Sequence, residues 1–263
     1  MKLLVKARYA SRKLRLGIRA GDLVLDVGCG HFPNPRADVI CDMISENKER
    51  SGDLVRDRSF VWARAEKLPF ASDAFDFVVL SHVLEHTFEP EKLLGEIQRV
   101  GRRGYIETPA AWREFLVPLE FHASAVDLAQ DGTLEIRIKR RWDEGVDERA
   151  PELRNGLRRV YEEILRTRPE LCMTRLFWTR PIKYRVARDT PSAWTKGTRS
   201  AADTEPPQSS RAYELLVKTV TALARPRRRI DLLRLLACPD CHGNLVQAPG
   251  KIEKLRCLGC SLE

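Results

Sequence analysis

A short apolar run that ends in an acid and two glycines constrains the fold of this chain more than any other feature. Residues 23–27 have the sequence Leu-Val-Leu-Asp-Val, and Gly28-Cys29-Gly30 follow directly. This pattern predicts a buried strand that feeds a glycine-rich turn, where the backbone can approach a ligand closely. Asp26 at the end of the strand can accept hydrogen bonds from that ligand. We expect the turn to bind a nucleoside, although no third glycine completes a dinucleotide-binding fingerprint.

Further strands and one helix follow at intervals typical of an α/β chain. Apolar runs predict strands at residues 37–41, 60–63, 75–80 and 105–109. A helix should begin near residue 89, because a proline and acids stand at its start. Its apolar face should consist of Leu93, Leu94, Ile97 and Val100.

Asp42 follows the second predicted strand, sixteen positions after Asp26. That distance suits a chain that returns to the same edge of the sheet. A carboxylate there can bind two ribose hydroxyls, although a solvated helix cap is the alternative.

Three motifs in this order and spacing resemble the class I S-adenosylmethionine-dependent methyltransferases over roughly residues 20 to 110. They are Leu-Asp-Val-Gly-Cys-Gly at 25–30, Ala-Glu-Lys-Leu-Pro-Phe at 65–70, and Phe-Asp-Phe-Val-Val-Leu-Ser-His-Val-Leu-Glu-His at 75–86. The resemblance implies a Rossmann-like α/β sheet with helices on both faces and S-adenosyl-L-methionine as the cofactor. In that family the glycine turn holds the methionine part, the acid after the second strand binds the ribose, and the segment after the third strand borders the adenine.

The resemblance therefore implies a set of cofactor-binding residues: Asp26, Gly28, Gly30, Asp42, Ala65, Glu66 and Ser81. One position departs from the family pattern, because Arg64 stands where many members carry an aspartate that accepts from the adenine amino group. Glu66 is the neighbouring acid that could supply this contact instead.

Methyl transfer from a sulfonium requires the alignment of donor and acceptor and the removal of a proton. We expect His82 and Glu107 to be the catalytic residues, with Glu85 and His122 as further titratable candidates near strand ends. His82, Glu85 and His86 could also resemble a metal site. We favour ordinary packing for them, because the resemblance implies backbone turns and helix packing at these positions and the sequence places no further ligand beside them.

Four cysteines near the end of the chain predict a metal site. Cys238, Cys241, Cys257 and Cys260 form two Cys-x-x-Cys pairs with fifteen residues between them. This spacing suits four thiolates around one structural Zn²⁺, and disulfides are disfavoured because nothing suggests secretion. Residues 235–260 resemble the small zinc-ribbon protein that activates several tRNA and protein methyltransferases as a separate subunit. The chain continues for only three residues after Cys260, so we expect an abbreviated ribbon.

These features predict three regions. Residues 1–188 should form the methyltransferase domain, 189–210 a Pro- and Ser-rich linker, and 211–263 a helix with the abbreviated zinc ribbon. Residues 132–139 and part of 175–186 alternate as strands do, and 158–165 has a helical pattern. The second strand pattern carries aromatic and basic residues that could bind a nucleic acid, but a half-buried strand is the favoured interpretation.

The 263 residues carry a formal net charge of +9, which suits phosphate-bearing or acidic partners without choosing among them. The basic N-terminal twenty residues predict a helix packed on the sheet, with peripheral membrane contact as the alternative. No apolar run approaches the ~20 residues that span a bilayer, and we expect a cytoplasmic enzyme. The expected substrate is a small-molecule, glycan or lipid-linked acceptor. RNA or protein methylation, or a non-catalytic scaffold, stays the alternative, and nucleic acid is not favoured as a partner.

Overall fold

The computed structural model describes residues 16–43, 53–119, 121–139, 151–188, 219, 229–248 and 254–260. The predicted linker at 189–210 and the first fifteen residues of the predicted N-terminal helix lie outside these residues, and residues 16–20 are not helical. No helix within the described ranges is both long and apolar enough to cross a membrane.

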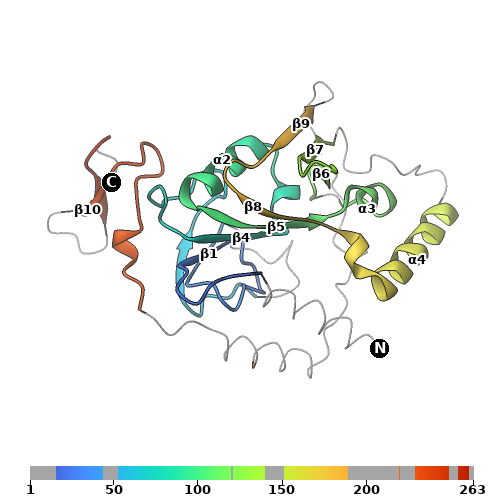
Figure 1. Cartoon of the computed structure of the whole chain (residues 1–263), viewed down its shortest axis with the longest axis horizontal. Helices are drawn as coiled ribbons and strands as arrows, with labels where there is room; N and C mark the ends of the chain where they lie inside the picture. Colours follow the sequence, from blue (N-terminus) through green and yellow to red (C-terminus); the bar gives the residue numbers. More distant parts are fainter. Residues whose placement is uncertain are drawn as a thin grey trace.

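A six-stranded mixed sheet forms the centre of the molecule (Figure 1). Its strands lie in the order β3-β2-β1-β4-β5-β8. The first five are parallel, and β8 runs antiparallel to β5. The bounds are β1 Val24–Val27, β2 Val39–Asp42, β3 Ser59–Trp62, β4 Phe77–Ser81, β5 Arg103–Pro109 and β8 Met173–Thr179. The five strands predicted between residues 23 and 109 are therefore confirmed.

Helix α2 (Pro90–Val100) covers one face of this sheet. Its predicted apolar face is fully buried against β1, β2, β4 and β5: Leu93, Leu94, Ile97 and Val100. The helix ends at Val100, and an added Cβ at the next residue, Gly101, would lie 2.3 Å from Val78 Cγ2. A glycine there allows the chain to leave the helix in close contact with β4. The helix prediction is confirmed.

The opposite face of the sheet carries a second buried cluster. Within the described part of the chain, Leu16 from the segment before β1 packs on this face, as do Cys29 and Ala37 from the connection between β1 and β2. The sheet contributes Val24, Ile40, Phe77, Val79 and Tyr105. Strands that are buried on both faces explain the continuous apolar runs in the sequence.

A smaller three-stranded sheet follows, in the order β6-β7-β9. Its strands are β6 Ser124–Leu128, β7 Leu134–Ile138 and β9 Tyr184–Arg188. The pattern at 175–186 thus divides between two sheets, because the chain turns at Arg180 and Pro181 between β8 and β9. Helices α3 (Ala111–Leu116) and α4 (Pro151–Thr167) and the 3-10 helices η2 (Leu84–His86) and η3 (Pro169–Cys172) complete this region.

The C-terminal segment lies at the other end of the molecule from α4 (Figure 1). It contains the short helix η5 (Leu232–Arg234) and the antiparallel pair β10 (Leu245–Gln247) and β11 (Leu255–Cys257). Backbone hydrogen bonds attach it to the loop before β4: Ala71 N donates to Leu235 O at 2.8 Å, and Ala237 N donates to Pro69 O at 3.0 Å. The segment therefore packs directly on the loop that follows β3.

Candidate functional site

The register of the parallel strands gathers the predicted cofactor residues at one edge of the sheet. Val27 pairs with Cys41 of β2 and Leu80 of β4, and Ser81 pairs with Glu107 of β5. The carboxyl ends of β1, β2, β4 and β5 consequently lie side by side. Ligands of open α/β sheets bind outside this edge.

The turn after β1 has a geometry that requires glycine. Gly28 and Gly30 have φ angles of 68° and 54°. The amides of Gly28 and Cys29 both donate to Cys41 O, at 2.8 and 3.1 Å. A Cβ at Gly28 would lie 2.3 Å from Val83 Cγ2. Residue 28 therefore combines a left-handed backbone with a close approach to the segment after β4.

Two buried acids shape this turn and the loop behind it. Asp42 Oδ2 accepts a hydrogen bond from Gly30 N at 2.8 Å, so the end of β2 is tied to the turn. Asp26 Oδ2 accepts from Asn34 N at 2.6 Å and holds the loop that leads to β2. Both residues are buried, with exposed fractions of 7% and 3%. Their carboxylates are thus placed by backbone hydrogen bonds rather than by solvent.

The segment after β3 lies against the loop that follows η2. Ala65 is buried, and Glu66 Oε1 accepts a hydrogen bond from Thr87 Oγ1 at 2.6 Å. The exposed Arg64 places its Nε 3.6 Å from Glu66 Oε2. Glu66 therefore joins the segments after β3 and β4 at the same edge of the sheet.

His82 lies between two carboxylates. Its Nδ1 is 3.3 Å from Glu85 Oε1, and its Nε2 is 3.9 Å from Glu107 Oε1. Its backbone φ is 59°, and its amide donates to Glu107 O at 2.8 Å. The side chain is partly exposed. This geometry fixes an accessible imidazole where β4 and β5 end.

The Glu107 carboxylate is buried, and two side chains donate hydrogen bonds to it. Its Oε2 accepts hydrogen bonds from Tyr105 Oη and Arg175 Nε, each at 2.7 Å. Burial alone would raise the pKa of Glu107, but the Tyr105 hydrogen bond and the charges of His82 and Arg175 lower it below its ordinary value. Glu107 consequently stays ionised beside His82.

A second group of titratable residues adjoins His82. Glu85, His86 and His122 each offer a ligand atom, and these atoms all lie within 4.8 Å of one another. Burial alone would raise the pKa of Glu85, but its pair with His82 and the charges of His86 and His122 lower it to about 2. Sequence spacing could not place His122 here, because only the folded chain brings the start of β6 to η2.

His122 in turn belongs to a buried ion network that sequence reasoning missed. Its Nδ1 lies 2.7 Å from Glu114 Oε1, and Lys139 Nζ donates to Glu114 Oε2 at 3.1 Å. Burial would raise the pKa of Glu114, yet the contacts with His122, Lys139 and Arg113 lower it to about 2. Nothing in the local sequence signals this network, since its members come from α3, the segment just before β6 and the residue after β7.

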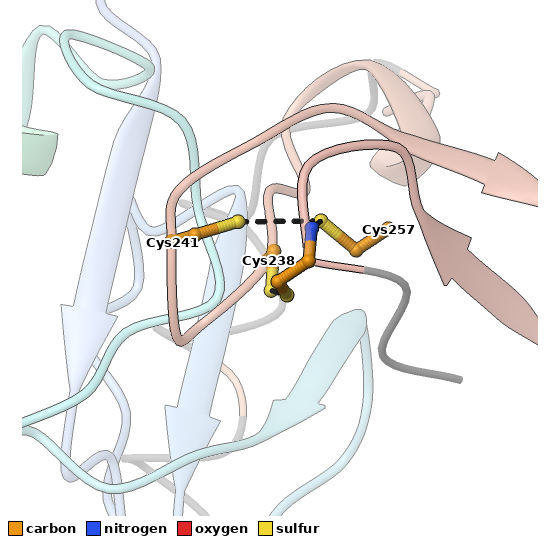
Figure 2. A group of neighbouring side chains, drawn as sticks. Cys238, Cys241 and Cys257 are labelled. Carbon is orange, nitrogen blue, oxygen red and sulfur yellow. Dashed lines mark hydrogen bonds between the residues drawn. The ribbon is translucent and has the colours of Figure 1, made fainter.

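The four C-terminal cysteines converge on one point. The Sγ atoms of Cys238 and Cys260 are 3.6 Å apart, and those of Cys241 and Cys257 are 3.3 Å apart. Figure 2 shows the side chains of Cys241 and Cys257 directed toward one another, the second from the end of β11. Sulfurs bound at about 2.3 Å around a tetrahedral zinc ion are roughly 3.8 Å apart, so the donor set fits such an ion.

The turn after Cys257 favours the thiolate form of this residue. Gly259 N and Cys260 N approach Cys257 Sγ at 3.2 and 3.5 Å. These backbone amides, that of Cys260 first, lower the pKa of Cys257 to about 6. A Cβ at Gly259 would lie 3.1 Å from Cys241 Sγ, so the loop packs tightly against the sulfurs.

Comparisons with known proteins match part of this chain to methyltransferases. Residues 25–106 match the family model described as "Methyltransferase domain". The chain is 33% identical over 115 residues to a demethylmenaquinone methyltransferase of Paenarthrobacter aurescens, covering 40% of this chain and 44% of that protein. It is 35% identical over 100 residues to a demethylmenaquinone methyltransferase of Renibacterium salmoninarum, covering 34% of this chain and 40% of that protein. The chain thus spans less than half the length of these relatives.

Among solved structures, an S-adenosylmethionine-dependent methyltransferase from Mesorhizobium loti covers 65% of this chain and 98% of its own, with 14% identity and a TM-score of 0.33. The family match and the ordered sheet together identify residues 25–106 as a class I methyltransferase domain.

Proposed function

We propose that this chain transfers a methyl group from S-adenosylmethionine to a small-molecule, glycan or lipid-linked acceptor. The observation that carries the proposal is the Gly28–Gly30 turn, which Asp42 holds at the carboxyl edge of a sheet that matches a methyltransferase domain. The curated relatives support a small-molecule acceptor, because their names specify demethylmenaquinone.

The proposed cofactor site uses residues from the ends of successive strands. Gly28 and Gly30 let the backbone of the turn approach the methionine part closely, because both have positive φ angles that glycine adopts without strain. Asp42 supplies a carboxylate for the ribose hydroxyls. The remaining proposed contacts come from the same edge of the sheet: Asp26, Ala65, Glu66 and Ser81.

S-adenosylmethionine supplies a methyl group on a positively charged sulfur, which leaves with the electron pair of the broken bond. The protein must therefore align the acceptor and remove its proton. We assign the proton transfer to His82, whose partly exposed imidazole lies at the end of β4. Glu85 and Glu107 lie on either side and stabilise the imidazolium that forms.

Asp42→Asn tests the ribose contact. The amide keeps the size of the side chain and can still accept from Gly30 N, but it loses the negative charge. A charge-assisted hydrogen bond contributes about 1.5–3 kcal/mol, so S-adenosylmethionine should bind roughly ten- to a hundredfold more weakly. Isothermal titration calorimetry measures this loss.

The matched control is Asp131→Asn, which changes an exposed acid in the turn between β6 and β7. This variant should bind S-adenosylmethionine as the parent does. Equal affinity in the Asp42→Asn and Asp131→Asn proteins would remove Asp42 from the cofactor site.

His82→Gln tests the proton transfer. The acceptor is first located by incubating the protein with labelled S-adenosylmethionine and separate small-molecule, lipid, glycan, RNA and protein fractions. With the methylated fraction, His82→Gln should lower turnover by about 10²- to 10⁴-fold and leave cofactor affinity unchanged. Label that enters only RNA or protein would contradict the proposed acceptor class, and full turnover without His82 would exclude it as the base.

We further propose one structural Zn²⁺ at Cys238, Cys241, Cys257 and Cys260. Four thiolates close the coordination sphere, so this ion would stabilise the C-terminal segment without binding substrate. The proposed organisation is a methyltransferase domain at 1–188, a linker at 189–210 and a region with a helix and the zinc ribbon at 211–263.

A further inference from the structure

We propose that Glu85, His86 and His122 bind a divalent transition-metal ion beside the glycine turn. Two imidazoles and one carboxylate form a ligand set that suits zinc, manganese, iron or cobalt. The three residues come from η2 and from the segment just before β6. This site is separate from the four cysteines and lies next to the predicted catalytic residue His82.

The distances are close to those that a bound ion needs. One ligand atom from each residue lies within 4.8 Å of the other two. Ligands about 2.1 Å from a tetrahedral zinc ion are roughly 3.4 Å apart. The group must therefore contract by on the order of 1 Å for all three ligands to bind such an ion.

Both imidazoles are already anchored through the nitrogen that a metal would not use. His122 Nδ1 lies 2.7 Å from the Glu114 carboxylate, which Lys139 and Arg113 keep ionised. His86 Nδ1 lies 3.2 Å from Phe121 O. With Nδ1–H donated to these acceptors, each ring presents Nε2 as a lone-pair donor. Metal-binding histidines are oriented by such carboxylate and carbonyl partners.

The Glu85 carboxylate gives an independent indication of a cation. Its side chain is 1% exposed, and neither oxygen accepts a hydrogen bond from a described residue. A buried ionised carboxylate without hydrogen bonds is costly, so such groups are usually paired or bound to a metal. The imidazole nitrogens of His82 and His86 lie 3.3 and 4.0 Å from Glu85 Oε1. A metal ion at this point would satisfy the oxygens directly.

The backbone holds the two halves of the site together. Ala123 N donates to Glu85 O at 2.7 Å, and Ser124 Oγ donates to Leu84 O at 3.4 Å. These bonds join the start of β6 to η2, so His122 cannot move away from Glu85 without breaking them. The ligands are therefore preorganised on a rigid part of the fold.

The position of the site suggests what the ion does, and this step rests on the proposed methyl transfer. Val83, two residues before Glu85, contacts the position where a Gly28 Cβ would lie. Three protein ligands leave a coordination position open for an acceptor hydroxyl, whose pKa the ion lowers. The acceptor O–H bond breaks, and its proton passes to His82. The oxygen bonds to the methyl carbon, and the carbon–sulfur bond breaks with its electron pair left on sulfur.

Cobalt titration tests the site in the full chain. Protein with zinc at the cysteines is titrated with Co²⁺ and followed by visible absorption and by metal analysis. We expect one additional Co²⁺ per chain without the near-ultraviolet charge-transfer band of thiolate ligation. Glu85→Gln and His86→Gln should each weaken this binding at least tenfold, because each removes a ligand.

His31→Gln is the matched control, because it removes an exposed imidazole outside the group and should leave Co²⁺ binding unchanged. The partly exposed His86 serves as the second variant in case Glu85→Gln fails to fold, as thermal unfolding would reveal. The proposal is overturned if the parent protein binds no Co²⁺ beyond the thiolate site, or if both ligand variants bind it normally. Calorimetry with S-adenosylmethionine is independent of this result and tests the proposed function separately.

Discussion

Gly28→Ala should reduce the affinity for S-adenosylmethionine by well over tenfold. The new Cβ would lie 2.3 Å from Val83 Cγ2, and residue 28 has a φ of 68° that alanine adopts only with strain. Overpacking of this kind typically costs about 1–3 kcal/mol. The chain must respond by shifting the turn or the segment after β4, and both adjoin the proposed cofactor site. Calorimetry and far-ultraviolet circular dichroism together separate lost binding from lost structure.

Gly132→Ala provides a matched control for the backbone conformation. Gly132 also has a positive φ, 80°, but an added Cβ there meets no atom within 4 Å. That variant should lose some stability and keep its cofactor affinity. The double variant Gly28→Ala/Val83→Ala removes the clashing methyl groups and should recover part of the binding. Unchanged affinity in Gly28→Ala would show that the turn does not approach the cofactor.

The central sheet was predictable because local patterns determine it. β1 and β2 are apolar apart from Asp26 and Asp42, and β4 is apolar up to Leu80, which is what strands buried on both faces require. Helix α2 was predictable for a similar reason, since its apolar spacing and its proline at the start are both local signals. Fold and family follow from the same short segments.

The polar networks around the site were not predictable, because they join residues that are distant in sequence. His122, Glu114 and Lys139 meet only after β6 and β7 have paired and α3 has packed beside them. No period or spacing rule links such positions. The same applies to Glu66, whose hydrogen bond to Thr87 depends on how the segments after β3 and β4 cross the edge of the sheet. The sequence therefore indicated which acids and histidines are candidate site residues, but it did not indicate which residues contact them.

The strand pattern at 175–186 illustrates a different limit. Alternation of apolar and polar residues identifies extended chain, but it does not say which sheet the chain joins. Here β8 pairs with β5 in the central sheet, whereas β9 pairs with β7 in the smaller one. Pairing with strands that are distant in sequence decides which sheet each half joins. The local pattern could therefore indicate only that these residues form strands.

Removal of zinc from the C-terminal cysteines should loosen both the ribbon segment and the loop on which it packs. Cys257→Ser removes a thiolate from the closed four-sulfur group, so the protein should lose its bound zinc. A segment of about thirty residues buries too little apolar surface to fold by itself. The backbone bonds from Ala71 N to Leu235 O and from Ala237 N to Pro69 O should then open more often. Hydrogen exchange at these two amides measures the change directly.

The loop that contains Pro69 and Ala71 follows Ala65 and Glu66, which we place near the adenine. We therefore expect the affinity for S-adenosylmethionine to fall, but by less than about tenfold. The backbone of the Gly28–Gly30 turn is held by hydrogen bonds with β2, Phe32 and Val55, which lie outside the ribbon segment. Binding should therefore weaken rather than disappear. Leu258→Ser is the control, because Leu258 lies between two of the cysteines and is 60% exposed. It should retain zinc and normal exchange. A parent protein purified under reducing conditions without zinc would refute the metal assignment. Unchanged protection of Ala71 in a zinc-free Cys257→Ser protein would show that the ribbon segment packs on the methyltransferase domain without needing the ion.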